Sequence, residues 1–91
     1  MALPLSQYQS ISARTANGQH LFAQHCAACH DMHSTAARSG PGLKSYYRTH
    51  QPRPSDTALR SIIRQGKGKM PAFSTLNKSQ TDDLIAFLKT L

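Results

Sequence analysis

Two cysteines and a histidine, the residues with the most distinctive chemistry in this chain, lie together in the run Cys26-Ala27-Ala28-Cys29-His30. On a helical turn, residues three and four apart share a face, so both thiols and the imidazole can meet one flat ligand. Such a run is typical of covalent c-type haem attachment, in which the thiols bind the haem vinyl groups and the imidazole binds iron. The motif therefore predicts one haem c, with Cys26 and Cys29 as anchors and His30 as an iron ligand.

Three other uses of a cysteine pair fit this sequence less well. A thioredoxin-like motif requires a preceding strand within a βαβ pattern, whereas the residues before Cys26 have helical spacing and the chain lacks hydrophobic β-runs. A structural zinc site requires four ligands, mostly cysteines, and the chain has no second cysteine pair. A disulfide would leave the adjacent His30 without a role.

Electron transfer through such an iron favours a second axial ligand, and methionine is one candidate. Met32 follows His30 too closely to cross to the opposite face of the haem, and Met1 is terminal. Met70 lies about 40 residues after His30, directly before Pro71, so the chain can return over the ring. Thioether ligation raises the reduction potential of the iron. From these residues alone, a role for Met70 as an ordinary core side chain remains equally open.

Four further histidines are rival axial ligands, namely His20, His25, His33 and His50. The first two precede the motif on the same expected helix, and the third follows it too closely. Only His50 has the reach to give a bis-histidine haem. We expect all four to be surface residues, as histidines often are.

Length and composition indicate one small domain. Domains run from about 50 to 250 residues, and a chain of 91 residues with 38% hydrophobic content and no tryptophan has a marginal core of its own. An enclosed haem would supply the missing apolar body. No run approaches the ~20 apolar residues of a membrane span, and the N-terminus lacks the features of a signal peptide. We expect residues 1–15 to be a leader or linker and residues 16–91 to be the single domain.

The hydrophobic spacing predicts an all-α chain with three main helices. The expected helices run from about Asn17 into the cysteine motif, from Asp56 to Gln65, and from about Ser79 to the C-terminus. Ser55 is a suitable N-cap for the second helix, and Gly66 suits its end. For the last helix, Ser79 and Asp82 resemble a capping box. The Gly- and Pro-rich stretch 31–55 is expected to be a long loop, with one helical turn over 43–48.

Four local patterns together resemble those of the class I c-type cytochromes. In chain order they are Gly18-x-x-x-Phe22, then Gly40-Pro41-Gly42-Leu43 after the haem motif, then Gly66-x-Gly68-x-Met70-Pro71-Ala72-Phe73, and a last helix containing Phe87. The resemblance implies the cytochrome c fold, with three main helices and loops wrapped around one covalently attached haem. It also implies that the first and last helices cross at Gly18, with Phe22 and Phe87 packing nearby.

The resemblance further implies a set of haem contacts. It makes His30 and Met70 the axial ligands of the iron, and it makes the Pro41 carbonyl the acceptor of a hydrogen bond from the His30 ring, a contact that fixes ring orientation. No tryptophan is present to bind the haem propionates, so other donors are expected there. The remaining haem-pocket residues that we expect are Phe22 and the candidate propionate donors Tyr46, Tyr47 and Arg48, although an ordinary loop role remains open for each of these three.

The charge balance points to an anionic partner. The chain carries 11 Lys and Arg against 4 Asp and Glu, a formal net charge of +7, and such a balance steers association with acidic surfaces. The sequence contains no basic helix, zinc finger or RNA-binding signature, so a nucleic-acid partner is not expected. We expect an acidic redox protein, or an oxidoreductase domain in the same polypeptide. The expected docking ring comprises Arg60, Arg64, Lys67 and Lys69.

The function expected from these observations is one-electron transfer by a single haem c that cycles between ferric and ferrous iron. With both axial positions filled, no site remains for a substrate, so the chain is not expected to be an enzyme. One alternative is the haem c electron-entry domain of a larger respiratory or dehydrogenase enzyme, and another is a five-coordinate haem that binds small ligands. Because covalent haem attachment in bacteria implies export, we expect a periplasmic location, as a soluble protein or an exported domain of a membrane-associated one.

Overall fold

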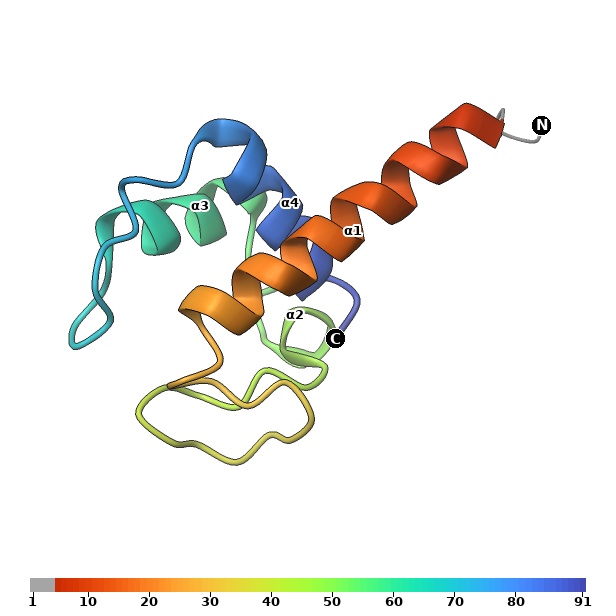
Figure 1. Cartoon of the computed structure of the whole chain (residues 1–91). Coiled ribbons are helices and arrows are strands. Elements are labelled where there is room, and N and C mark those ends of the chain that lie inside the picture. The colour runs from red at the N-terminus through yellow and green to blue at the C-terminus, as the bar shows by residue number, and fades with distance from the viewer. Residues whose placement is uncertain (1–4) are drawn as a thin grey trace.

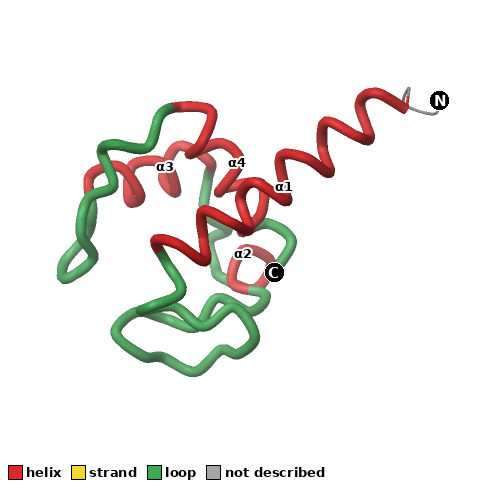
Figure 2. Tube along the Cα trace, viewed as in Figure 1, coloured by secondary structure: helices red, strands yellow, loops and turns green. Residues whose placement is uncertain are grey.

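The computed structural model describes residues 5–91, and side chains from residue 13 onward. This part of the chain contains four α-helices and no strand (Figures 1 and 2), and an isolated bridge pairs Lys67 with Met70. The helices are α1 (Leu5–His25), α2 (Tyr46–Thr49), α3 (Asp56–Gln65) and α4 (Lys78–Leu88). The all-α fold class is confirmed. What the sequence predicts for residues 1–4 lies outside the described residues.

Helix α1 is much longer than the sequence analysis expects. It begins at Leu5, so the prediction of a start near Asn17 was wrong. The physical reason is that neither proline nor glycine interrupts residues 5–17, and those are the residues that break helices most strongly. The expected boundary between leader and domain at residue 16 therefore falls inside a continuous helix. Figure 1 shows the first half of this helix projecting beyond the other elements.

The contact between α1 and α4 organises the fold. A Cβ atom at Gly18 would clash with the carbonyl oxygen of Asp83 and with the side chain of Phe87, so only glycine allows the two backbones to come this close. One turn later, the rings of Phe22 and Phe87 pack with centroids 5.6 Å apart. The predicted helix crossing is thus confirmed. Within the described residues, no helix has both the length and the apolar composition needed to span a membrane.

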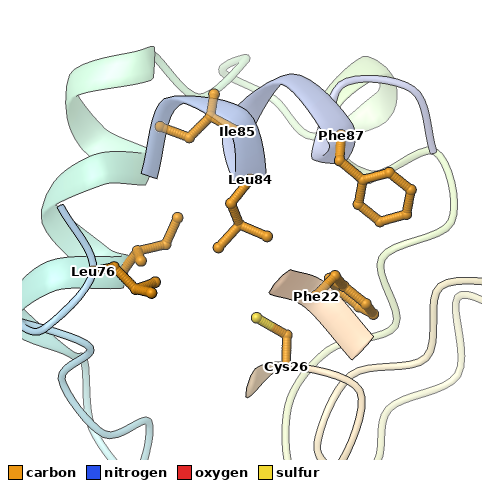
Figure 3. Packing of buried hydrophobic residues seen from close by; sticks show 7 residues of the cluster. Phe22, Cys26, Leu76, Leu84, Ile85 and Phe87 are labelled. Carbon is orange, nitrogen blue, oxygen red and sulfur yellow. The ribbon is translucent and has the colours of Figure 1, made fainter. Parts of the chain in front are cut away.

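The buried core is small and lies where α1, α3 and α4 meet. Figure 3 shows Leu84 of α4 pointing toward Phe22 of α1 and toward Cys26, which directly follows α1. The buried hydrophobic residues are Phe22, Cys26, Ile63, Leu76, Leu84, Ile85 and Phe87. A cysteine of the proposed haem motif is therefore part of the core itself.

The ends of α3 agree with the sequence analysis. The side chain of Ser55 accepts a hydrogen bond from the Ala58 amide at 3.0 Å, as an N-cap does. Gly66 follows the last turn with a φ of 79°, a conformation that favours glycine. Both the bounds of this helix and its capping residues are confirmed.

The start of α4 differs from the expected one. Asn77, not Ser79, is the N-cap: its side chain accepts from the Gln80 amide at 2.8 Å, and its own amide donates to the Gln80 side chain at 2.9 Å. The predicted Ser79–Asp82 box was therefore wrong. Asparagine is at least as good an N-cap as serine, and the carboxylate of Asp82 is occupied by basic side chains. The short turn expected over 43–48 is helix α2, displaced by a few residues.

Candidate functional site

A cavity with two connected lobes lies beside the cysteine motif. The inner lobe, between α1, α3 and α4, has a cavity volume of about 110 Å³ and an almost wholly apolar wall. The outer lobe, between the motif and residues 67–73, has a cavity volume of about 290 Å³. Both lobes open to solvent to a similar degree. The two lobes share four lining residues, Cys26, His30, Ile62 and Met70.

The cysteine motif continues α1 by one turn. The Cys26 amide donates to the Phe22 carbonyl at 2.8 Å, and the His30 amide donates to the Cys26 carbonyl at 3.0 Å. This turn places Cys26 against both lobes and Cys29 against the outer one. Burial, and then the neighbouring Cys29, raise the pKa of the Cys26 thiol to about 11. That sulfur is therefore uncharged at neutral pH, which suits a thioether in an apolar wall.

The ring of His30 is held by the segment that follows the motif. Its Nδ1 lies 2.8 Å from the carbonyl oxygen of Pro41, and because a carbonyl can only accept, Nδ1 carries the proton. Nε2 then keeps a free lone pair, the form in which imidazole binds a metal. A Cβ atom at Gly40 would clash with the imidazole ring. The two residues Gly40 and Pro41 therefore fix the ring's orientation and its tautomer.

Arg38 is part of this arrangement, and the sequence analysis missed it. Its guanidinium donates to the Ala27 carbonyl at 2.8 Å, and the Gly40 amide donates to the Cys29 carbonyl at 2.9 Å. Carbonyl groups at the end of a helical turn need such donors. The sequence could have suggested this role only through the position of Arg38, a basic residue that follows a helix end. That position does not identify Ala27, 11 residues earlier, as the hydrogen-bond partner.

Met70 reaches the cavity from a tight turn after α3. Its amide donates to the Lys67 carbonyl at 2.9 Å, and the Lys67 amide donates back to the Met70 carbonyl at 3.2 Å. Gly66 and Gly68 have positive φ angles of 79° and 58°, which allow the chain to reverse here. The side chain of Met70 thus shares both lobes with His30. Met32, by contrast, packs against the hydrophobic core and lines neither lobe.

The rival histidines lie at the rim of the cavity or away from it. His20 and His33 line two separate surface hollows. His50 stacks on Tyr46, with ring centroids 4.4 Å apart, and lines neither lobe. His25 lines the outer lobe but is exposed, and its ring lies against Phe73. Among the histidines and methionines with described side chains, only His30 and Met70 line both lobes.

The other expected pocket residues are only partly brought together. Phe22, Tyr46 and Tyr47 line the inner lobe, and Pro41 lines the outer one. Arg48 lines neither lobe: it is exposed, and its guanidinium donates to the Ser45 side chain at 3.1 Å. Arg48 points away because helix α2 places successive side chains about 100° apart around its axis.

The expected docking ring also loses one member. The guanidinium of Arg60 lies 2.7 Å from the carboxylate of Asp82, which Lys78 approaches to 2.9 Å. These bonds, from Lys78 first and then Arg60, hold the pKa of Asp82 below its usual value. Lys67 and Lys69 instead line the mouth of the outer lobe. Arg64 lies in the last turn of α3, shortly before them in sequence.

Comparison with known proteins identifies relatives across most of the chain. A family model described as cytochrome c oxidase, cbb3-type, subunit III matches residues 13–88. A cytochrome c6-like protein of Nostoc sp. strain PCC 7120 is 31% identical over 75 residues, which cover 81% of this chain and 68% of that protein. The cytochrome c6 of Cyanidioschyzon merolae is 30% identical over 80 residues, covering 88% and 77%. The cytochrome c6 of Cyanidium caldarium is 26% identical over 87 residues, covering 96% and 80%. A comparison with solved structures found no match.

The cavity fits the cofactor that these relationships imply. An apolar hollow suits a porphyrin, two thiols stand on one side of it, and an imidazole with a fixed tautomer shares its wall with a thioether. The cofactor is haem c, attached covalently through Cys26 and Cys29, and the activity is haem-based electron transfer. By fold, by motif and by family match, this chain belongs to the class I c-type cytochromes.

Proposed function

We propose that the chain is a one-electron carrier, without enzymatic turnover, whose haem iron is held between His30 and Met70. The observation that carries this proposal is that both side chains line both lobes of the cavity, although they come from segments far apart in sequence. The haem, when bound, supplies a one-electron couple between ferric and ferrous iron. With both axial positions occupied by protein, no coordination site remains for a substrate.

The protein's own residues set the properties of this couple. The Pro41 carbonyl accepts a hydrogen bond from Nδ1–H of His30, and this bond makes the imidazole ring more electron-rich. A thioether from Met70 favours the reduced iron and raises the reduction potential. Phe22 and the other apolar residues of the inner lobe keep water from the ring. Tyr46 and Tyr47, which line that lobe and not the outer one, are the hydroxyl donors that we propose for the haem carboxylates.

The partner that we propose is an acidic redox protein that docks over the mouth of the outer lobe. Lys67 and Lys69 line that mouth, and Arg64 lies nearby in sequence. Among residues 13–91, the ion pairs of Asp56, Asp82 and Asp83 involve other basic residues, namely Arg14, Arg60, Lys78 and Lys89. The positive charge around the mouth is therefore not neutralised within the chain, and it remains available to steer a partner.

A second candidate is that the chain is the haem c domain of a larger oxidoreductase, with a partner in the same polypeptide. Two observations favour it: the matching family model is described as an oxidase subunit, and the first half of α1 projects beyond the other elements (Figure 1). Under either candidate we propose a periplasmic location in a bacterium, because covalent haem attachment implies export there.

Replacement of Met70 tests the proposed ligand set directly. Met70→Ala in the haem-loaded protein should abolish the weak near-infrared sulfur-to-iron band of the ferric form, lower the reduction potential and allow the ferrous form to bind carbon monoxide. Met32→Ala is the matched control, because Met32 lines neither lobe. It should leave all three properties unchanged.

Two results would contradict the proposal. If the wild-type protein lacks the near-infrared band, and if the ferrous His50→Ala variant binds carbon monoxide, then His30 and His50 are the two axial ligands. If the wild-type ferrous protein binds carbon monoxide readily at neutral pH, one axial position is open and a ligand-binding function replaces electron carriage.

A further inference from the structure

The end of the cavity remote from Cys29 must receive the charged edge of the haem. A haem carries its two vinyl groups and its two propionates on opposite edges of the porphyrin. Because Cys26 and Cys29 bind the vinyl edge, the propionates face the other end of the inner lobe. Tyr46, Tyr47 and Pro54 line that lobe and not the outer one.

Two carboxylates at an otherwise apolar end need compensating charge, because an unpaired ion away from water is costly. Arg48 is one candidate donor from the sequence, but its guanidinium bonds the Ser45 side chain at 3.1 Å. Neither Arg48 nor two other cations, Arg53 and Lys89, line a lobe themselves. What distinguishes Arg53 and Lys89 is their contact with Tyr47, which lines the inner lobe.

Two cations from different elements converge on Tyr47. The guanidinium carbon of Arg53, in the loop before α3, lies 5.5 Å from the centre of its ring. The ammonium of Lys89, directly after α4, lies 5.4 Å from the same centre. Both distances lie within the range of cation–π attraction, so the ring of Tyr47 holds both cations beside the lobe that it lines.

The other charged and titratable groups at this end are few. Asp56, at the start of α3, lies 2.7 Å from the ammonium of Lys89. His50 is stacked on Tyr46, with its Nε2 3.5 Å from the tyrosine hydroxyl. Asp56 thus pairs with one of the two cations, and none of the ion pairs among residues 13–91 involves Arg53.

We propose that Arg53 and Lys89, positioned by the ring of Tyr47, are the cations that compensate the haem propionates, in place of Arg48. The inference rests on the haem c of the proposed function and adds residues that the family motifs do not contain. It joins three segments around one anionic group: the turn of α2, the loop before α3 and the end of α4.

Two consequences can be measured in the haem-loaded protein. A nearby cation disfavours the more positive ferric state, so its removal should lower the reduction potential. A cation within ~4–6 Å also keeps a carboxylate ionised to lower pH, by about 1–3 pH units. Its removal should therefore move the pH-dependent fall of the potential, which accompanies propionate ionisation, upward by about one pH unit.

The experiment compares the reduction potential from pH 4 to 9, in roughly unit steps, for wild type, Arg53→Gln, Lys89→Gln and Arg48→Gln. The first two variants should lower the potential and shift its pH-dependent fall upward, whereas Arg48→Gln should change neither. Arg53→Lys keeps the charge and should behave as wild type. If Arg53→Gln and Lys89→Gln match Arg48→Gln, the proposal is overturned.

Two further variants separate the proposal from its rivals. If Asp56→Asn reproduces the effect of Lys89→Gln, Lys89 acts by tying α3 to α4 and the proposal is wrong for that residue. If the pH-dependent fall disappears in His50→Gln, the titrating group is the histidine and the proposal fails. The near-infrared band reports the axial ligands independently, so a failure here is distinguishable from a failure of the proposed His30–Met70 ligation.

Discussion

The contact between Gly40 and His30 shows how one missing side chain orients a ligand. The glycine Cα lies against the imidazole ring, so a methyl group there would clash with the ring atoms. At the same time, the Pro41 carbonyl accepts from Nδ1 at 2.8 Å. Displacing the ring would break that bond, so the steric and polar constraints on His30 act together.

A single methyl group at Gly40 should therefore disturb the site. Gly40→Ala should destabilise the haem-loaded protein by about 1–3 kcal/mol, the usual cost of overpacking, and alter its ferric spectrum. Urea unfolding and visible spectroscopy measure the two effects.

Gly68→Ala is the matched control for this prediction. A Cβ atom at Gly68 meets nothing within 4 Å, although the φ of 58° still disfavours alanine. It should cost about 1–2 kcal/mol from backbone strain in the turn that carries Met70, without displacing the His30 ring. A normal spectrum in Gly40→Ala would contradict the steric role that we assign to Gly40.

At the scale of elements, the crossing of α1 and α4 depends on Gly18. Alanine is favoured over glycine in helix interiors by about 1 kcal/mol, so propensity alone predicts that Gly18→Ala stabilises the protein. The clash with the Asp83 carbonyl and with Phe87 opposes this. Because both obstacles are parts of a packed helix, we expect the clash to dominate.

The predicted outcome is that Gly18→Ala lowers the free energy of unfolding by about 1–3 kcal/mol, measured by urea denaturation of the haem-loaded protein. Gln19→Ala, at an exposed position next to it, should be close to neutral. A stabilised Gly18→Ala protein would show that the helices separate at little cost.

The ion pairs of Asp82, with Arg60 of α3 and with Lys78 of its own helix α4, predict a pH dependence of stability. Bonds from Lys78 and Arg60 lower the pKa of Asp82 in the folded protein. A depressed pKa contributes stability that is present above the unfolded-state value, about 4, and is lost as pH falls through the folded-state value. Acidification below pH 4 should therefore lower the urea midpoint of the wild type more than that of Asp82→Asn. Equal losses in the two proteins would exclude this carboxylate as a source of acid sensitivity.

For the whole molecule, charge distribution matters more than the net charge of +7. The internal ion pairs occupy basic residues of α1, α3 and α4 and the lysine after α4. Lys67 and Lys69 line the outer lobe and take part in none of these ion pairs. Under the proposed docking of an acidic redox protein, the partner would therefore be attracted to the mouth of the outer lobe rather than to the surface as a whole.

Rates of electron transfer with an acidic partner should fall steeply with salt, because the Debye length shrinks to about 10 Å at 0.1 M. Charge reversal at Lys67 and Lys69 should flatten this dependence and leave the reduction potential nearly unchanged. Lys44→Glu is the control, since Lys44 lines a separate hollow. Stopped-flow kinetics at several salt concentrations measure the effect. A flat profile in the wild type with its physiological partner would favour a partner tethered in the same polypeptide.

The sequence by itself determined the features that depend on residues close together in the chain. The cysteine motif predicts the cofactor because two thiols and an imidazole act within one turn. Ser55 and Gly66 predict both ends of α3, because a cap bonds only the turn beside it. The resemblance to the class I c-type cytochromes predicts the close helix approach at Gly18, where the absence of a Cβ allows it.

Tertiary structure decided what depends on contacts between distant segments. The carboxylate of Asp82 binds Arg60 from α3, and the cap of α4 falls to Asn77. Arg48, which has the right charge and a suitable place in the sequence, bonds Ser45 and lines neither lobe, whereas Lys89, more than 40 residues further along the chain, approaches Tyr47. Local propensities cannot determine these pairings, because each depends on how separate helices and loops pack around one cavity.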